Sequence, residues 1–357
     1  MSAEHSLFCA DSLSEFLSDA FQHVGLSRAH ARQVTDSMIV ANLRGVDTHG
    51  VVRSGAYLDR LHARLVNPRP ELRITRTYPW AVSIDADNAM GAVAANYAMD
   101  LVLEQAGKFG LGGATVKHSN HFGAASVYAL RAAEAGCIGI VLSPASKSLA
   151  PFGSMEPMFG TNPIAMACPA GRHAPWVMDM ATSVAARGHI RIAARRGEPI
   201  PEGWALDSQG KSTTDAEASL KGVMLPFAGA KGSALAMMVD ILGGVLSGSA
   251  FGGDIRDMNT DSTAPQNVGH FFMAFKIDAF MPDDAFAARM DEEIRRLKAL
   301  KPAAGFSEVK YPGEHEAHLA VLRAENGIPI SSETLKVLLS VACQTGAVLP
   351  QSLVSKV

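Results

Sequence analysis

The stretch Val116-Lys-His-Ser-Asn-His-Phe-Gly-Ala-Ala125 places two histidines, a serine and an asparagine between an apolar run and a segment of helical periodicity. The run that ends at Val116 predicts a strand, and residues 124–135 predict a helix. In α/β proteins such a junction often carries the chemistry, because helix-start amides and strand-end side chains converge there. The stretch therefore indicates either a ligand-binding turn around His121 or a polar turn whose histidines form only structural hydrogen bonds.

A second polar cluster, Arg44-Gly-Val-Asp-Thr-His-Gly-Val-Val-Arg53, interrupts an otherwise helical N-terminal region. Periodic apolar positions predict helices over 11–24, from Ser27 to about Leu43, and over 57–65. Between them, Thr48 could orient His49 for proton transfer, and Arg53 could bind a carboxylate through two hydrogen bonds. The structural alternative is a pair of capping residues next to a surface arginine.

Three further segments have the composition of ligand-holding loops or turns. Phe159-Gly-Thr-Asn-Pro-Ile164 is rich in residues that fix a backbone path. Asp179 follows a buried run, so it is either paired or perturbed, or else it caps a helix that begins near Ser183. Lys231 lies at the start of a predicted helix beside two glycines, which is a weak anion-site signal and does not match GxxxxGK[ST].

Composition excludes several classes of protein. The chain has 357 residues, of which 48% are hydrophobic, so two domains with large cores are expected. A net charge of -3 without a basic block argues against a nucleic-acid partner. The four cysteines are scattered without metal-binding spacing, and no run has the roughly 18 apolar residues of a membrane helix. We therefore expect a cytoplasmic protein with reduced thiols, without a metal site and without a membrane partner.

No conventional dinucleotide-binding fingerprint is present. The glycines of Gly110-Leu-Gly-Gly113 precede a predicted strand instead of following one, and no GxGxxG opens a helix elsewhere. A doubly wound nicotinamide-binding domain is therefore disfavoured.

The rest of the chain alternates predicted elements with loops. Strands are expected at 138–142, up to Met178 and over 270–278, and helices at 187–196, after Lys231, after Pro282 and from Ser331. The arginines of 187–196 are most simply a solvated face, although a phosphate-binding role is an alternative. Residues 197–226 have little periodicity and predict a long surface loop.

Taken together, the motifs resemble the malate/L-lactate dehydrogenase family of the non-Rossmann type, from about residue 10 to about residue 330. Relatives include ureidoglycolate, sulfolactate and diketogulonate oxidoreductases and the reductases of cyclic imines such as pyrroline-2-carboxylate and piperideine-2-carboxylate. The motifs that carry the resemblance are Asp47-Thr-His-Gly50 with Arg53, Ser119-Asn-His-Phe-Gly123, Gly160-Thr-Asn-Pro-Ile164, Asp179-Met-Ala-Thr-Ser183, Lys231-Gly232 and Tyr311-Pro-Gly-Glu314.

The resemblance implies an α/β fold with an unusual cofactor domain, built on a largely antiparallel mixed sheet, and a helical domain made from both chain ends. On this basis we expect residues 1–115 and 275–357 to form the helical substrate and dimerisation domain. Residues 116–274 would then form the NAD(P)-binding domain. The resemblance also implies a homodimer whose active site lies between domains.

The implied activity is the NAD(P)-dependent interconversion of a small 2-hydroxy acid and its 2-oxo acid, with a malate-, lactate- or sulfolactate-like substrate. Carried over by position, the catalytic residues would be His49, Thr48, His121 and Asp179, and the substrate-binding residues Arg53 and Lys147. The cofactor-binding residues would be His121, Phe122, Gly123, Thr161, Asp179, Met180, Thr182, Ser183, Lys231, Gly232, Gly313 and Glu314.

These roles agree with elementary chemistry, and some choices stay open. Reduction of a carbonyl leaves an alkoxide that needs a proton, and histidine titrates in a suitable range. His49 is favoured over His121 as the group that moves this proton, and NAD and NADP are both compatible with the sequence. An NADPH-dependent reductase of a cyclic imino acid is the alternative activity. A hydrolase in which Thr48 and His49 form a nucleophile system is disfavoured, because the sequence has no nucleophile elbow. A non-enzymatic binding or structural protein would have no use for the set His49, Arg53, His121 and Asp179.

One departure from the family pattern concerns the cofactor segment. Lys231-Gly-Ser-Ala234 replaces the aromatic-and-glycine pattern that is more usual after Lys-Gly, which leaves the shape of the cofactor pocket open. The stretch around His121 is closer to the hydroxy-acid members than to the imine reductases, whose equivalent loop tends to carry a tryptophan.

Overall fold

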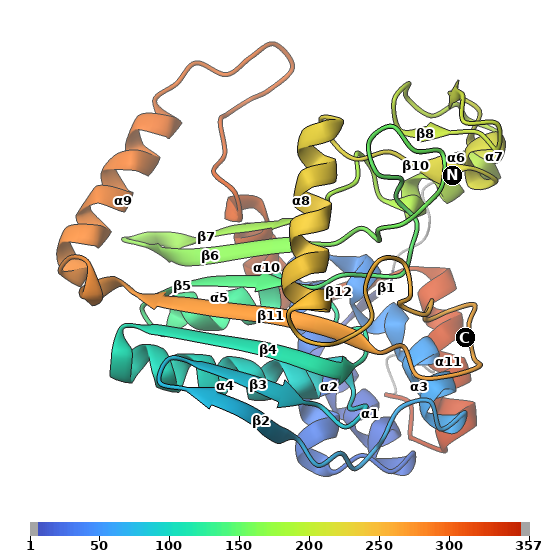
Figure 1. The fold of residues 1–357 in the computed structure, drawn as a ribbon, viewed down its shortest axis with the longest axis horizontal. Helices are drawn as coiled ribbons and strands as arrows, with labels where there is room; N and C mark the ends of the chain where they lie inside the picture. The colour runs from blue at the N-terminus through green and yellow to red at the C-terminus, as the bar shows by residue number, and fades with distance from the viewer. Residues whose placement is uncertain (1–5, 351–357) are drawn as a thin grey trace.

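A mixed sheet of seven strands runs through the centre of the computed structural model, which describes residues 6–350 (Figure 1). The strand order is β2-β3-β4-β11-β5-β6-β7. β3 and β4 are parallel, and the other neighbouring pairs are antiparallel. This confirms the expected largely antiparallel mixed sheet. Its strands are β2 (Arg73–Tyr78), β3 (Ala81–Asp85), β4 (Leu111–Ser119), β5 (Cys137–Leu142), β6 (Ile164–Ala170), β7 (His173–Met180) and β11 (Val268–Lys276).

Helices cover the two faces of this sheet unequally. α4 (Gly91–Phe109) and α5 (Ser126–Glu134) lie behind it in Figure 1, and α8 (Ala230–Asp240) crosses in front and continues into the π-helical turn η3 (Ile241–Val245). α4 approaches β4 so closely that a Cβ at Gly112 would lie 1.9 Å from the Val102 carbonyl oxygen. Gly110 ends α4 with a φ of 76°. The glycines at 110–113 therefore allow a helix end and close helix–sheet packing.

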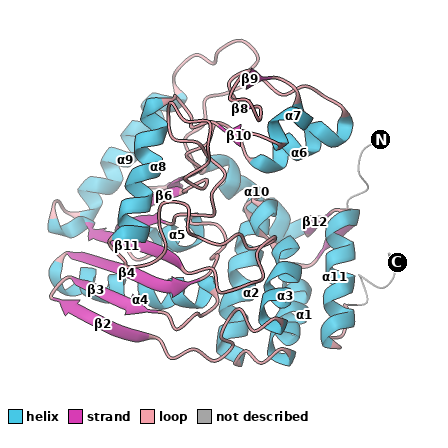
Figure 2. Ribbon diagram, turned by 45° about the vertical axis from the view of Figure 1, so that its right-hand side comes forward, coloured by secondary structure: helices cyan, strands magenta, loops and turns pink. Residues whose placement is uncertain are grey.

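Both chain ends contribute to a helical layer beside the sheet (Figure 2). Residues 6–8 pair with 328–330 as antiparallel strands, which ties the two ends together. The helices predicted from Ser27 and from Ser331 are present, and each of these serines caps its helix, its hydroxyl accepting from an amide three residues on. The elements are β1 (Ser6–Phe8), α1 (Ala10–His23), α2 (Arg28–Leu43), α3 (Ser54–His62), α10 (Glu314–Asn326), β12 (Ile328–Ile330) and α11 (Ser332–Thr345).

Residues 187–226 fold into a small lobe. The long loop expected over 197–226 contains a three-stranded sheet of two-residue strands and a one-turn helix, elements too short to show a hydrophobic period. Arg195 and Arg196 pair with Glu333 and Glu198, which agrees with a solvated basic face. The lobe comprises α6 (Arg187–Arg196), β8 (Ala205–Leu206), β9 (Ser212–Thr213), α7 (Ala216–Leu220) and β10 (Val223–Met224).

The domain boundaries expected from the sequence fall inside strands. The boundary at 115/116 would cut β4, and the boundary at 274/275 would cut β11, although these strands are hydrogen bonded to each other. After β11, the 3-10 turn η4 (Ile277–Ala279) leads to α9 (Asp283–Lys298). α9 packs on β6 at the end of the sheet remote from α11 (Figure 1).

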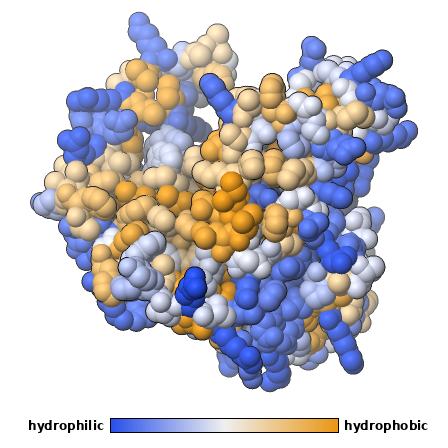
Figure 3. All heavy atoms as spheres, in the orientation of Figure 1, coloured by the Kyte–Doolittle hydropathy of each residue, from blue (hydrophilic) through white to orange (hydrophobic). Residues whose placement is uncertain are grey.

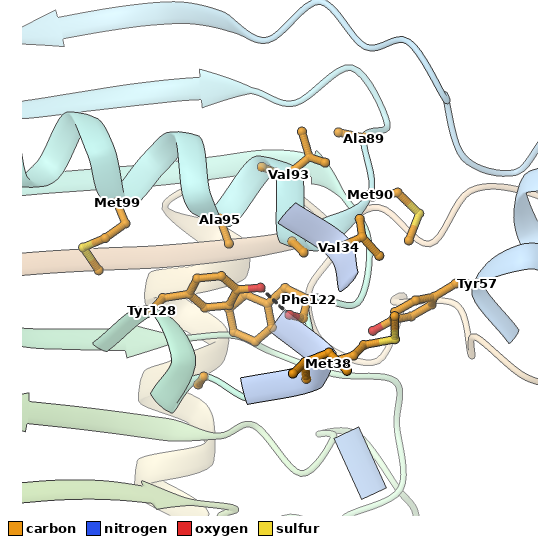
Figure 4. Close-up of a cluster of buried hydrophobic side chains, with 14 of the residues drawn as sticks. Val34, Met38, Tyr57, Ala89, Met90, Val93, Ala95, Met99, Phe122 and Tyr128 are labelled. Carbon is orange, nitrogen blue, oxygen red and sulfur yellow. Dashed lines mark hydrogen bonds between the residues drawn. The ribbon is translucent and has the colours of Figure 1, made fainter. Parts of the chain in front are cut away.

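The main hydrophobic core joins the helical layer to the sheet. Figure 4 shows side chains of α2 and α4 packed with Tyr57, Phe122 and Tyr128. The Tyr128 hydroxyl donates to the Phe122 carbonyl oxygen. The core therefore extends to the residue directly after His121.

Candidate active site

The polar cluster at 47–53 forms two 3-10 turns held by one buried side chain. The Asn42 amide nitrogen donates to the Asp47 carboxylate at 2.6 Å, and its oxygen accepts from the Val51 amide at 2.8 Å. A Cβ at Gly50 would lie 2.0 Å from that Asn42 oxygen, so a larger residue would displace the Asn42 side chain from its hydrogen bonds. The turns are η1 (Asp47–His49) and η2 (Val51–Arg53).

A residue from the far end of the chain holds the same turn. Arg323 of α10 donates to both carboxylate oxygens of Asp47, at 2.7 and 3.1 Å, and also to the Asn42 carbonyl oxygen. This guanidinium is largely buried, since its side chain is 15% exposed. The geometry of the turn therefore depends on α2 and α10 together.

The turn presents a histidine and an arginine side by side. The Thr48 hydroxyl lies 3.0 Å from Nδ1 of His49, as the sequence predicted. Arg53 Nε donates to the Thr48 carbonyl oxygen at 2.6 Å, which leaves its terminal nitrogens for another partner. Thr48 can therefore orient the imidazole, and Arg53 can offer two parallel donors to a carboxylate.

His121 meets this turn from the other half of the molecule. Its ring stacks on that of His49 with centroids 5.6 Å apart and planes 21° apart. Its backbone amide donates to the Gln266 side-chain oxygen at 3.1 Å, and its Nδ1 lies 2.8 Å from the Tyr57 hydroxyl. The other histidine of the opening stretch, His118, stays at the surface 3.0 Å from an Asp85 carboxylate oxygen.

Charge and burial keep both imidazoles neutral. Desolvation, followed by the nearby positive Arg53, lowers the pKa of His49 to about 4. The same two causes, together with His49 and His270, lower the pKa of His121 well below its usual value. Both side chains remain partly accessible to solvent although protein atoms crowd them, as expected of groups that line a concave site.

A buried histidine supports the turn from beneath. His270 is fully buried between the hydroxyls of Ser143 and Ser119, each 2.9 Å from one ring nitrogen, and burial lowers its pKa to about 3. Its ring stacks on Phe122 with centroids 4.5 Å apart and planes 3° apart. His270 therefore fixes the backbone that presents His121.

Asp179 lies near the end of β7 and faces the start of α5. Its carboxylate accepts from the Ser126 amide at 2.8 Å, so it caps a helix distant in sequence and not one that begins near Ser183; α6 starts only at Arg187. The surrounding protein desolvates the carboxyl and raises its pKa, although the residue stays accessible to solvent. The raised pKa and the solvent accessibility of Asp179 are both explained if the residue lies on the wall of a surface depression.

Several of the predicted cofactor residues form a connected ribbon of backbone. The Thr182 amide and hydroxyl both donate to the Thr161 carbonyl oxygen, at 2.8 and 3.0 Å. The Phe227 amide donates to the Thr182 carbonyl, and Gly232 packs against Phe227 with no room for a Cβ. Ser183 lies on the same ribbon, with its hydroxyl donating to the Ala185 carbonyl. Met180 ends β7 next to Asp179.

The other predicted site residues lie around this ribbon. Gly313, with a φ of 88°, packs against Val177 at the start of α10. Glu314 is engaged by the Lys298 ammonium at 2.6 Å and by the Tyr311 amide at 3.1 Å. Lys147 is exposed beside Gly253, and among the described residues no hydrogen bond or ion pair joins it to His49 or His121.

Two cavities lie away from the imidazoles. One of about 600 Å³ opens at the start of α8, where Phe152, Met155, Leu206 and Leu225 form apolar walls beside Gly229. The other, of about 700 Å³, lies between the β6–β7 turn and α9 among charged side chains. The first adjoins the Lys231 segment and can receive an aromatic ring.

Within residues 6–350, no group of three or more His, Cys, Asp or Glu side chains is arranged to hold a metal ion. In the same residues, no helix is long and apolar enough to cross a membrane.

Sequence patterns did not identify four residues of this site. Tyr57 is part of an ordinary apolar helical stripe, His270 part of a strand, and Asn42 the end of a helix. Gln266 precedes β11 in a loop. For Tyr57, His270 and Asn42 the one available signal was a polar group within an apolar segment, which is too common to indicate a site.

Comparison with known proteins supports one family. The family model described as malate/L-lactate dehydrogenase matches residues 8–339. A malate dehydrogenase of Pyrococcus abyssi is 38% identical over 94% of each chain. A ureidoglycolate dehydrogenase (NAD(+)) of Escherichia coli K12 is 35% identical over 92% of this chain and 94% of its own. A delta(1)-pyrroline-2-carboxylate reductase of Burkholderia multivorans is 36% identical over 73% and 77%.

The fold agrees with this assignment. The solved structure of sulfolactate dehydrogenase from Methanocaldococcus jannaschii superposes with a TM-score of 0.91 at 31% identity, covering 96% of this chain and 98% of that one. The family consists of oxidoreductases of 2-hydroxy acids and related substrates, and it implies a nicotinamide cofactor. Because the family model spans nearly the whole chain, this protein belongs to the malate/L-lactate dehydrogenase family.

Proposed function

We propose that this chain interconverts a small 2-hydroxy acid and the corresponding 2-oxo acid, with NAD or NADP as the hydride carrier. The observation that carries the proposal is the meeting of His49 and Arg53, from one turn, with His121, which comes from a separate part of the chain. A guanidinium beside two neutral imidazoles can bind a carboxylate and serve the oxygen on the neighbouring carbon.

Arg53 would hold the substrate carboxylate. Its Nε is fixed on the Thr48 carbonyl, so its outer nitrogens are oriented before the substrate arrives. A bound carboxylate would also offset the positive charge that lowers the pKa of both imidazoles. Substrate binding would thus offset the Arg53 contribution to the low pKa of His49, while the larger contribution from desolvation remains. Lys147 would contribute a second positive charge from the loop beside Gly253.

His49 would exchange the proton with the substrate oxygen. In the reductive direction an oxygen that gains negative charge needs a proton, and in the oxidative direction a base removes it. The Thr48 hydroxyl can donate to or accept from Nδ1 of His49, so it supports either protonation state of the ring. Asp179 would lie where the substrate and cofactor sites meet.

The start of α8 and the cavity beside it suit a dinucleotide. Lys231 lies in the first turn of α8, where its ammonium and the positive end of the helix dipole suit phosphates. The adjoining 600 Å³ cavity has apolar walls that suit the adenine ring. When bound, the nicotinamide supplies or accepts the hydride. The 161–162 and 180–183 segments, with His121-Phe-Gly123 and Gly313-Glu314, would line the path between the two ends.

The alternative activity is the reduction of a cyclic imino acid. The Burkholderia multivorans relative, a pyrroline-2-carboxylate reductase, supports this alternative. Such a substrate presents the same carboxylate to Arg53 and a C=N bond in place of C=O. The histidine would then protonate nitrogen.

A substrate panel tests the function directly. Oxidation of NADH and NADPH would be followed with malate-, lactate- and sulfolactate-type 2-oxo acids and with five- and six-membered cyclic imino acids. Activity on 2-oxo acids supports the proposal, and activity on imino acids alone supports the alternative. Absence of turnover with every substrate, under conditions where the cofactor binds, would count against both.

Two variants test the assigned roles. His49→Ala should lose turnover by about two orders of magnitude or more while cofactor binding persists, because acid–base catalysis contributes roughly 10²–10⁴-fold. Arg53→Ala should chiefly raise KM for the carboxylate substrate. Arg32, on the exposed side of α2, provides a control, since Arg32→Ala removes an arginine of the same helical region away from the site.

We also propose that the exposed apolar face around α8 binds a second copy of the chain. Met237, Ile241, Val245 and Leu246 of α8 and the turn after it are 46–59% exposed. Figure 3 shows a broad hydrophobic surface on the face of the molecule that α8 crosses in Figure 1. Clusters of exposed apolar side chains on one face often mark protein–protein interfaces. Leu246→Asp should convert dimers to monomers in light scattering, whereas Val321→Asp on α10, which is 58% exposed before substitution, should not.

The cysteines support a reducing compartment such as the cytoplasm. Cys9, Cys137, Cys168 and Cys343 are all free thiols.

A further inference from the structure

We propose that Tyr57 is a positioning residue that holds His121 in the tautomer with its proton on Nε2, so that His121 offers a hydrogen-bond donor to the substrate oxygen. The proposal rests on the function proposed above and adds a division of labour between the two imidazoles. It follows from the atoms that surround one ring nitrogen.

Two donors converge on Nδ1 of His121. The Tyr57 hydroxyl oxygen lies 2.8 Å away, and the Gly123 amide nitrogen lies 3.4 Å away in hydrogen-bonding geometry. A backbone amide can only donate, so the Nδ1 lone pair must face it. A hydrogen on Nδ1 would point at the amide hydrogen of Gly123. The network therefore assigns the proton of the neutral ring to Nε2.

The tyrosine cannot move away from this contact easily. Tyr57 is 5% exposed and belongs to the main core cluster, where Figure 4 shows it at one edge beside Met38 and Met90. Burial raises the pKa of its hydroxyl, so Tyr57 keeps its proton throughout the neutral range. The group is thus a permanent donor mounted on a packed helix.

The histidine is held from its backbone side as well. Its amide is fixed by Gln266, whose own amide group donates to the Arg256 carbonyl oxygen at 3.1 Å. The buried guanidinium of Arg60 anchors the loop between them, donating to the carbonyl oxygens of Asp261 at 3.0 Å and Ala264 at 3.2 Å. A 180° turn of the ring would put carbon in front of both donors and lose both hydrogen bonds.

Gly123 lets the chain turn directly after the second donor. Its φ of 86° is a conformation that favours glycine, while a Cβ at this position would meet open space. Backbone conformation, and not steric crowding, is therefore the reason for glycine here.

The division of labour follows from these contacts. A neutral imidazole with Nε2–H can stabilise negative charge on the substrate oxygen but cannot accept a proton there. His49 has only the Thr48 hydroxyl on its Nδ1, and a hydroxyl accommodates either protonation state. His49 is thus the ring that changes protonation during turnover.

The test uses nitrogen NMR of the full chain labelled with ¹⁵N-histidine, with His121 assigned by its absence from His121→Gln. In the parent we expect His121 Nδ1 to resonate as an unprotonated nitrogen and Nε2 as a protonated one. Tyr57→Phe should shift both resonances towards their average, because the Gly123 amide at 3.4 Å is then the remaining, weaker donor to Nδ1 and the second tautomer becomes populated. Tyr128→Phe is the matched control: it removes a core hydroxyl that donates to the next residue, Phe122, and should leave the His121 resonances in place.

Kinetics give an independent readout. Tyr57→Phe should lower kcat by about threefold to tenfold with little change in KM for the carboxylate substrate, since one net hydrogen bond is worth about 0.5–1.5 kcal/mol. A parent spectrum with the proton on Nδ1 would overturn the proposal, as would a Tyr57→Phe spectrum identical to the parent. The nitrogen spectra need no turnover, so a failure of the proposed enzymatic function would leave the tautomer assignment standing or falling on its own.

Discussion

Asn42→Ala should unlock the turn that carries His49 and Arg53, and its cost can be worked out from the contacts. The substitution leaves the Val51 amide, in a residue that is 0% exposed, without a partner. A buried donor left unsatisfied costs about 1–3 kcal/mol. It also removes the bond to the half-exposed Asp47 carboxylate, worth about 1 kcal/mol in that setting. The expected loss in the free energy of unfolding is thus about 2–4 kcal/mol.

Urea unfolding followed by circular dichroism measures this loss, and steady-state kinetics on the same sample measure its functional effect. We expect kcat to fall and KM for the carboxylate to rise together, because His49 and Arg53 move as one unit. Asn96→Ala is the matched control. Asn96 also makes two side-chain hydrogen bonds, to Ala92 and Arg131, but it lies on α4. It should lower stability without the paired kinetic change.

The reasoning would be refuted by an Asn42→Ala enzyme that loses less than about 1 kcal/mol and keeps normal kinetics. A loss of stability equal to that of Asn96→Ala, with unchanged KM, would also contradict the proposed role of Asn42 in holding the turn.

Three further outcomes are expected. His270 has a folded pKa of about 3, below its unfolded value of 6.5. Its neutral ring therefore contributes fully to the stability of the fold above pH 6.5, and this contribution is lost as the pH falls towards 3. In His270→Gln, the slope of the unfolding free energy against pH between 5.5 and 4.5 should be smaller by about 1.4 kcal/mol per pH unit. Because the pKa of Asp179 is raised in the fold, its charged form destabilises the fold above that pKa. Asp179→Asn should therefore be more stable than the parent at pH 7 but not at low pH, and its turnover should fall. A variant whose stability equals that of the parent at both pH values would contradict this. Lys231→Met should weaken cofactor binding in fluorescence titrations at low salt more than at high salt, and a salt-independent effect would argue against a phosphate contact.

Local signals in the sequence predicted most of the elements correctly. The helix starts at Ser27 and Ser331 and the strand–turn–helix around His121 depend on short-range chemistry, so they could be predicted without tertiary information. The small lobe at 187–226 could not be predicted in detail, because its two-residue strands are defined by pairing across the chain and not by any period of their own.

Some residues of the candidate site could likewise be predicted from the sequence, and others could not. His49, Arg53 and His121 were conspicuous because polar residues of that kind interrupt apolar segments, and the family resemblance connected them. Tyr57 was not identified, since its hydroxyl meets His121 across 64 positions and nothing local marks it. Asp179 was identified, but its helix-capping partner was misassigned, because the Ser126 amide is brought to it only by the packing of α5 on the sheet.

The clasp between Arg323 and Asp47, together with the pairing of residues 6–8 with 328–330, has a consequence for biosynthesis. A ribosome delivers His49 and Asn42 early, but Arg323, which also holds the turn, lies 276 positions after Asp47 and emerges much later. Fragments that stop short of α10 should therefore fold parts of the sheet and yet remain inert. A prematurely terminated product of this gene should therefore have no partial oxidoreductase activity.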